Sequence, residues 1–144
     1  MPTTNFAHEL QPGDEYQALE FTVSAETNQQ VLFAQEDFDQ RFTGRDFAGS
    51  ETLVHPALLL QMAANTKSPS FKLAPGTGSI LSEAETEFLA PVRIGTKLRV
   101  TWRVTHEYEK RGRRYYVMAA EIADEKGEPI LRRNLHLTFP SMQA

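Results

Sequence analysis

The feature that most limits how this chain can fold is a short helical segment that is apolar on nearly every side. The stretch PALLLQMAAN runs from Pro56 to Asn65, and its apolar side chains surround nearly the whole helix. A helix of this kind belongs in a core rather than on a surface. Proline suits the first helical turn, where its missing N–H has no partner to lose. We therefore expect a central buried helix at about residues 56–66.

Four segments in the second half of the chain alternate between apolar and polar residues. They cover residues 79–92, 96–110, 113–124 and 129–139. A period of two with polar residues on one side is typical of antiparallel strands with one solvated face. The links between the segments are short and contain Gly or Pro, as hairpin loops do. A curved antiparallel sheet wrapped around the central helix satisfies both patterns, so we predict the α+β class.

The first half of the chain carries weaker signals. We expect residues 1–13 to form an N-terminal arm, residues 16–24 a short strand, and residues 40–54 a loop without periodicity. Ser24 suits a helix N-cap, so residues 25–38 are predicted to form a surface helix. The apolar side of this helix is expected to hold the residues at helical spacing, which are Thr27, Val31, Ala34 and Phe38.

Conspicuous side chains on the predicted strands suggest packing rather than chemistry. Three carboxylates lie at alternate positions of the first long strand, and we expect them to pair with Arg99 and Arg103 of the next strand. These carboxylates are Glu83, Glu85 and Glu87. The aromatic residues Trp102, Tyr108, Tyr115 and Tyr116 are expected to pack in the core or across strands.

Length and composition exclude several classes of protein. The 144 residues are 40% hydrophobic and 24% charged, which is the balance of one globular domain covering residues 1–144. The chain has no run of 18 apolar residues and no signal peptide, so we expect no membrane association. It has no cysteine, which excludes disulfides and fits a cytoplasmic protein. The net charge of −4 argues against nucleic-acid binding.

Two further groups of charged or titratable residues have simple interpretations. The four histidines show no metal-ligand spacing, so neither a metal nor a cofactor is expected. The basic residues Lys110, Arg111, Arg113 and Arg114 surround a glycine and predict a solvated hairpin turn, with attraction of a phosphate-bearing or acidic carrier as the alternative.

Most of the chain, roughly residues 12–139, resembles the MaoC-like dehydratase and hydratase superfamily, whose members have the hot-dog fold. The resemblance rests on FTVSAETNQQVLFA, FTGRD, VHPALLLQMA, EFLAPVRIGTKLRVTWRV, YEKRGRRYYVMAAEIADEKGEPIL and HLTF. It implies binding of acyl thioesters of coenzyme A or acyl carrier protein. It also implies addition of water to the acyl chain, or its removal, by dimers of hot-dog units.

The family's catalytic motif is an Asp followed five positions later by a His, within a Gly-Asp-x-Asn-Pro-x-His loop. The pair moves protons at the α and β carbons, and an N–H at the start of the central helix polarises the thioester carbonyl. This sequence departs from the motif, because Glu51 stands five positions after Asp46. His55 matches the His that family members often carry just before the central helix, and Pro56 follows it where the family usually has Gly.

The resemblance nevertheless marks candidate site residues. Asp46 is the first candidate for proton transfer, with Glu51 or His55 as the second group. The alternative is a structural role in the loop for Asp46, a solvated or helix-capping role for Glu51, and a role in capping or orienting the loop for His55. Ala57 and Leu58 carry the first free N–H groups of the helix, so we expect them to bind the thioester carbonyl.

Three functions remain open from the sequence. The first is an acyl-thioester hydratase or dehydratase, a lyase of fatty acid metabolism. The second is a non-catalytic thioester-binding module or the partner of an active hot-dog subunit, and the third is a hot-dog acyl-CoA thioesterase. In each case we expect a homodimer or higher even oligomer, or a hetero-oligomer with a catalytic subunit, because a small curved sheet leaves an edge to cover.

Overall fold

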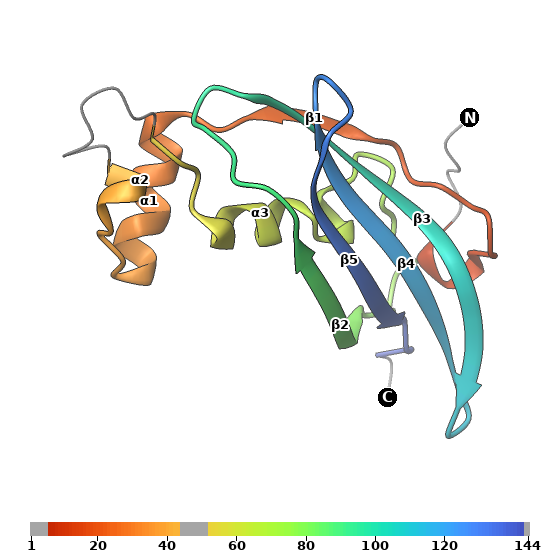
Figure 1. The fold of residues 1–144 in the computed structure, drawn as a ribbon. Helices are drawn as coiled ribbons and strands as arrows, with labels where there is room; N and C mark the ends of the chain where they lie inside the picture. Colours follow the sequence, from red (N-terminus) through yellow and green to blue (C-terminus); the bar gives the residue numbers. More distant parts are fainter. Residues whose placement is uncertain (1–5, 44–51, 143–144) are drawn as a thin grey trace.

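The computed structural model describes residues 6–43 and 52–142. Figure 1 shows a single sheet whose strands bend past a short central helix, with two further helices beside the start of that helix. The strands are β1 (Leu19–Thr22), β2 (Ile80–Phe88), β3 (Lys97–Lys110), β4 (Arg113–Asp124) and β5 (Pro129–Thr138). The α-helices are α1 (Ala25–Gln35), α2 (Gln40–Thr43) and α3 (Pro56–Met62), and two 3₁₀ turns are η1 (Ala7–Glu9) and η2 (Asn65–Lys67).

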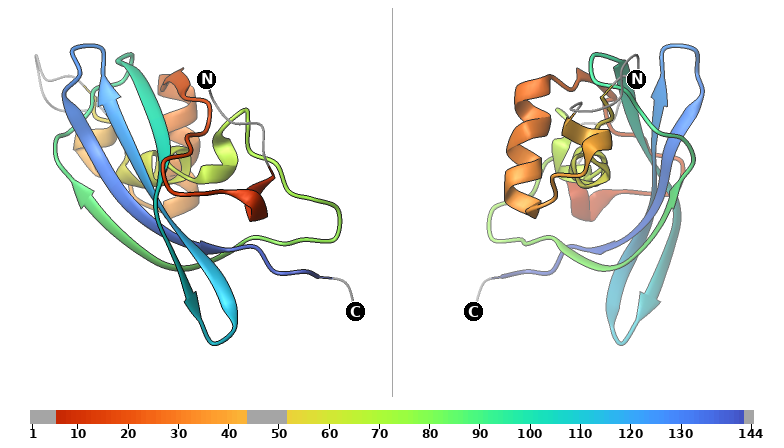
Figure 2. Two further views of the ribbon diagram at one scale, coloured as in Figure 1. Left: turned by 90° about the vertical axis from the view of Figure 1, so that its right-hand side faces the viewer. Right: turned by 60° about the vertical axis from the view of Figure 1, so that its left-hand side comes forward.

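The five strands form an antiparallel sheet in the order β1-β3-β4-β5-β2. The sheet curves around α3, which lies against its concave face (Figure 2). The predicted α+β class, the four long strands and the central helix are therefore confirmed. The turn between β3 and β4 has two residues with positive φ, Arg111 and Gly112, as a tight hairpin requires.

The central helix is buried on one side rather than on all sides. Leu58, Leu59 and Ala63 are buried, whereas Leu60 is half-buried and Gln61 is exposed. The helix begins at Pro56 as predicted and ends at Met62, before the 3₁₀ turn η2. One flank of α3 thus remains open beside the sheet.

Helix α1 begins as the sequence predicts but buries a different set of residues. The Ser24 hydroxyl accepts the N–H of Thr27 at 3.1 Å, which confirms the N-cap. The predicted apolar side is wrong, since Thr27, Ala34 and Phe38 are exposed. The buried residues are instead Asn28, Val31 and Leu32, because the Asn28 side chain finds hydrogen-bond partners in the interior.

The loop predicted at residues 40–54 contains a short helix, α2. Asp39 starts this helix by accepting the Arg41 N–H on its side chain at 2.9 Å and the Phe42 N–H on its carbonyl at 2.9 Å. An Asp in this position satisfies donors that the first helical turn leaves free. Such a cap was not recognised because the four-residue helix is too short to show periodicity.

The outer carboxylates of β2 do not pair with the strand that follows them in sequence. Strand β2 pairs with β5, so Glu83, Glu85 and Glu87 lie opposite His136, Asn134 and Arg132. The predicted pairing with Arg99 and Arg103 is wrong, because β5 and β4 lie between β2 and β3. Arg99 instead forms an ion pair with Glu20 at 3.5 Å.

The aromatic residues pack as predicted. Trp102 and Tyr116 are buried in the core, and the rings of Tyr108 and Tyr115 stack across β3 and β4 with centroids 5.2 Å apart.

The described part of the expected N-terminal arm lies against the body of the protein. There, Ala7 and Leu10 are buried. Across the described ranges, no helix has the length and apolar character needed to cross a membrane.

Candidate active site

His55 occupies the start of α3 and serves as its N-cap. Its ring Nδ1 accepts the N–H of Ala57 at 3.0 Å, and its carbonyl accepts the N–H of Leu58 at 3.0 Å. Both N–H groups that the sequence suggested for carbonyl binding therefore have partners within the chain. Asp46 and Glu51, the other two predicted site residues, lie outside the described residues.

The second ring nitrogen of His55 faces a carboxylate that the sequence analysis did not single out. His55 Nε2 lies 3.0 Å from Asp37 Oδ2. Because Nδ1 accepts the Ala57 N–H, it carries no proton, and the proton of the neutral ring must be on Nε2, where it is donated to Asp37. The His55 side chain is 12% exposed and the Asp37 side chain 43% exposed, so His55 is largely buried whereas Asp37 is accessible to solvent.

Local structure also fixes the carboxylate. Glu36 has φ 53° and ends α1 in the left-handed conformation, which turns the chain so that Asp37 follows directly. The Asp37 N–H donates to the Leu32 carbonyl at 3.0 Å. Asp37 Oδ1 accepts the Asp39 N–H at 3.2 Å, while Oδ2 faces His55. Both oxygens of Asp37 are therefore oriented before any ligand arrives.

A buried amide holds the two segments of the pair together. Asn28 of α1 is 1% exposed, and its Oδ1 accepts the backbone N–H of His55 at 2.8 Å. Its Nδ2 donates to the carbonyls of Phe42 at 3.3 Å and Leu53 at 3.1 Å. One side chain thus ties α1, α2 and the segment before α3 to each other. A fully hydrogen-bonded buried amide of this kind rigidifies its surroundings.

Neither Asp37 nor Asp46 has the His five positions later that the motif of the resembling family contains. Five positions after Asp37 stands Phe42, whose ring packs on the His55 ring with centroids 4.8 Å apart. The imidazole beside Asp37 is supplied by His55, 18 positions further along the chain. A search for a His at the motif spacing passes over Asp37, and no local sequence signal marks its pairing with a His 18 positions away.

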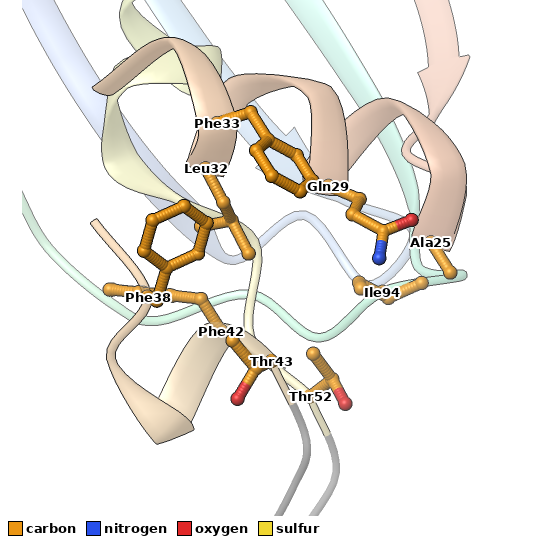
Figure 3. A pocket seen from close by; sticks show the side chains of 9 residues that line it. All are labelled: Ala25, Gln29, Leu32, Phe33, Phe38, Phe42, Thr43, Thr52 and Ile94. Atoms are coloured by element: carbon orange, nitrogen blue, oxygen red, sulfur yellow. The ribbon is translucent and has the colours of Figure 1, made fainter. Parts of the chain in front are cut away.

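A pocket of about 610 Å³ lies between α1, α2 and the segments around Thr52 and Ile94 (Figure 3). Its lining includes Phe42, whose ring packs on His55, but neither Asp37 nor His55. Phe33 and Phe38 stand at it with their rings in an edge-to-face contact of 5.2 Å. They are 65% and 53% exposed, which is unusual for such large apolar side chains. The volume is in the range of small-molecule sites.

The chemistry available at the pair is proton transfer. A carboxylate and a neutral imidazole in hydrogen-bond contact can act as base and acid towards a bound water or carbon acid. Over residues 6–43 and 52–142, no cluster of three His, Cys, Asp or Glu side chains could hold a metal ion.

The fold that presents this pair is the hot-dog fold: an antiparallel sheet curved around a central helix. No family model matches the sequence, and no curated protein matches it. The chain is similar in structure to the monoamine oxidase regulatory protein from Archaeoglobus fulgidus, with 16% identity over 99% of this chain and 97% of that chain and a TM-score of 0.77.

Two further solved structures share the fold. A MaoC-like dehydratase from Rhodospirillum rubrum matches with a TM-score of 0.72 and 17% identity, covering 97% of this chain and 99% of that chain. The R-hydratase PhaJ1 from Pseudomonas aeruginosa matches with a TM-score of 0.70 and 18% identity, covering 92% of this chain and 84% of that chain. The predicted hot-dog fold is thus confirmed, and it is the fold of MaoC-like dehydratases and R-hydratases.

Proposed function

We propose that this chain is an acyl-thioester hydratase or dehydratase in which Asp37 and His55 transfer the protons. The observation that carries the proposal is the 3.0 Å contact between Asp37 Oδ2 and His55 Nε2 at the start of the central helix. The contact supplies a carboxylate and an imidazole in a fold shared with R-hydratases and MaoC-like dehydratases. In this proposal the pair serves in place of the family's Asp and His motif, which the sequence lacks.

The contact between Asp37 and His55 allows both residues to return to their starting protonation states at the end of the reaction. In the hydration direction, a water held by Asp37 loses a proton to the carboxylate as its oxygen bonds to the β-carbon of a 2-enoyl thioester. His55 takes part as the imidazolium, with a second proton on Nδ1 once the Ala57 N–H has been released, because a neutral ring that lost its Nε2 proton would become an imidazolate. The Nε2 proton of this imidazolium goes to the α-carbon, so the double bond gains H and OH. The proton on Asp37 then returns to His55 across their 3.0 Å contact. Dehydration follows the same steps in reverse.

The thioester carbonyl needs a donor as charge develops on its oxygen. Ala57 and Leu58 remain our candidates for this role, although both N–H groups now donate to His55. A carbonyl can use either group only by replacing His55 as its acceptor. Binding would then loosen the cap and free Nδ1, which would let His55 change its protonation state during the reaction.

We also propose that two copies pair through β2. Every residue of this nine-residue edge strand is exposed, and one side of its backbone has no strand partner in the described chain. Ile80, Leu81, Phe88 and Leu89 are large apolar residues left in solvent there. Antiparallel pairing with a second copy, or with a related hot-dog subunit, would cover both the backbone and these side chains.

Turnover of trans-2-enoyl-CoA substrates of several chain lengths tests the proposal, with hydration followed by loss of the enoyl-thioester absorbance. We expect Asp37→Asn and His55→Gln each to lower kcat about 10²–10⁴-fold. The surface control Glu85→Gln should have no effect. Asp46→Asn and Glu51→Gln test the residues that the sequence first suggested, and loss of activity only in those variants would contradict the Asp37–His55 assignment.

The same assay separates the other functions left open by the sequence. Release of free CoA thiol in place of hydration would identify a thioesterase. If neither reaction occurs but acyl-CoA raises the melting temperature, the chain is a thioester-binding module or a partner subunit. If no acyl-CoA or acyl-carrier thioester binds at millimolar concentration, the proposed function is wrong.

A further inference from the structure

Arg133 lies on the concave face of the sheet, beside the open flank of α3. It is half-buried on β5, where its cross-strand neighbours are Thr86 on β2 and Ala120 on β4. Its Nε donates to Thr86 Oγ1 at 3.0 Å, and its Nη1 donates to the Leu60 carbonyl at 3.3 Å. The guanidinium therefore bridges the edge strand and the last turn of α3.

This inward-facing cation has no counter-ion within the described chain. Arg132, the preceding residue on the opposite face, pairs with Glu121 at 2.8 Å, and this hydrogen bond raises the pKa of Arg132. Burial alone lowers the pKa of Arg133, and no described carboxylate pairs with it. A partly desolvated charge without an opposite charge lowers the stability of the fold, so its presence points to an anionic ligand that binds when the protein functions.

The Arg133 guanidinium keeps enough donors for such an anion. It carries five N–H groups, and two of them have partners among the described residues. The remaining N–H groups can bind both oxygens of a carboxylate in the paired geometry that guanidinium favours. The flanking residues on the same face of β5, Leu131 and Leu135, are buried and apolar, so Arg133 is set among core side chains that offer its charge no polar partner.

The distance to the candidate catalytic pair decides which anion fits. Leu60 follows His55 by five residues, which is about 8 Å along a helix. The phosphates of coenzyme A lie beyond a pantetheine arm that is as long as four or five extended residues, about 15 Å. An extended pantetheine arm therefore carries the phosphates well beyond the distance of Arg133 when the acyl chain is at His55. A carboxylate on a short acyl chain of about four to six carbons spans the gap.

We propose that Arg133 binds a carboxylate at the far end of the acyl group, so that the substrates of this protein are thioesters of short dicarboxylic acids. The inference rests on the proposed acyl-thioester function and adds the class of acyl group. Arg133 acts here as a specificity-determining residue, and it takes no part in proton transfer.

The experiment measures binding of saturated thioesters, which cannot be hydrated. Glutaryl-CoA and pentanoyl-CoA have equally long acyl chains and differ in the terminal carboxylate, and succinyl-CoA with butyryl-CoA and adipyl-CoA with hexanoyl-CoA extend the comparison. Titration calorimetry should show tighter binding of the carboxylate-bearing member of at least one pair, by about 10- to 100-fold. Arg133→Met should abolish the preference, and the outward-facing control Arg132→Met should retain it.

Arg133→Lys keeps the positive charge but cannot form the paired hydrogen bonds of a guanidinium. It still tests the inference if Arg133→Met does not fold. We expect Arg133→Lys to retain a reduced preference. Equal affinities of wild-type protein within all three pairs would overturn the inference. So would a preference that survives in Arg133→Met. If Arg133→Met instead converts a dimer to monomers and leaves the preference intact, the anion is a carboxylate of the second copy and the inference is wrong.

Failure of the inference and failure of the proposed function give different results. A protein that prefers glutaryl-CoA but hydrates no enoyl thioester keeps the Arg133 assignment and loses the hydratase assignment. A protein that hydrates unsubstituted enoyl thioesters and shows no carboxylate preference keeps the hydratase assignment and loses the Arg133 assignment.

Discussion

The indole Nε1 of Trp102 donates a hydrogen bond to the carbonyl of Ala63 at 2.9 Å, and both residues are buried. The bond joins the middle of β3 to the C-cap residue that follows α3. It satisfies a carbonyl that the end of the helix would otherwise leave unpaired in the core.

Replacing Trp102 by Phe should therefore lower the free energy of unfolding by about 2–4 kcal/mol. The variant loses the hydrogen bond, leaves the Ala63 carbonyl unpaired and creates a small cavity. Urea denaturation followed by circular dichroism measures the change. A loss below about 0.5 kcal/mol would show that the surrounding core closes over the gap and that the bond contributes little.

Leu59→Asp should unfold the protein. The side chain is 3% exposed, and an unpaired buried carboxylate costs several kcal/mol against a total stability of about 5–15 kcal/mol. Gln61→Asp is the matched control, because Gln61 is exposed on the same helix. The two melting temperatures decide the matter, and an unchanged value for Leu59→Asp would place this face of α3 outside the core.

Tyr16→Phe should stabilise the protein at neutral pH by roughly 1 kcal/mol. The Tyr16 hydroxyl is buried and finds no hydrogen-bond partner among the described residues, so its removal relieves a desolvation cost. Tyr116→Phe is the control with the opposite expectation, since the Tyr116 hydroxyl donates to the His8 carbonyl at 2.8 Å. Chemical denaturation of both variants at neutral pH gives the comparison.

The same tyrosine predicts a dependence on alkaline pH. Burial, with a further contribution from Tyr116, raises the pKa of Tyr16 above its ordinary value. The unfolded chain therefore ionises Tyr16 from about pH 10 upward while the folded chain keeps it neutral. Stability present below pH 10 is lost above it, by up to about 1.4 kcal/mol per pH unit from this group. The stability gap between Tyr16→Phe and wild type should widen above pH 10, and a constant gap would count against the raised pKa.

His55→Asn should separate the structural role of His55 from its proposed chemical role. Asn can still cap α3, so we expect a loss of less than about 1 kcal/mol, whereas His55→Ala should lose about 1–2 kcal/mol. Both variants remove the contact with Asp37 and should lose hydration activity equally. Melting curves and the enoyl-CoA assay measured on the same samples test this. Full activity in His55→Asn would assign His55 to capping alone.

Phe88→Lys should weaken the proposed dimer. Phe88 is 50% exposed on the edge strand, and a charge at this position opposes pairing of β2 with a second copy. Phe33→Lys, at a residue of similar exposure on α1, should leave the dimer intact. Light scattering at micromolar concentration distinguishes the two variants. A monomeric wild type, or a dimer that survives Phe88→Lys unchanged, would rule out this interface.

The sequence by itself determined the elements whose patterns are local. The four long strands follow from alternation with a period of two, and α3 begins at Pro56 where the polar loop gives way to an apolar run. Ser24 identified the start of α1 because an N-cap bond involves residues only three positions apart. These features depend on neighbouring residues, so they can be inferred before the chain is folded.

Only the tertiary structure decided which distant residues meet. Asp37 and His55 are 18 positions apart, and the turn at Glu36 together with the bonds of Asn28 brings them to 3.0 Å. Likewise, β2 lies beside β5 because the sheet closes around α3 in that strand order, which places Arg133 next to the edge strand. Periodicity shows which face of a strand is buried but does not show which strand lies next to it, since that depends on how all the strands pack around one helix.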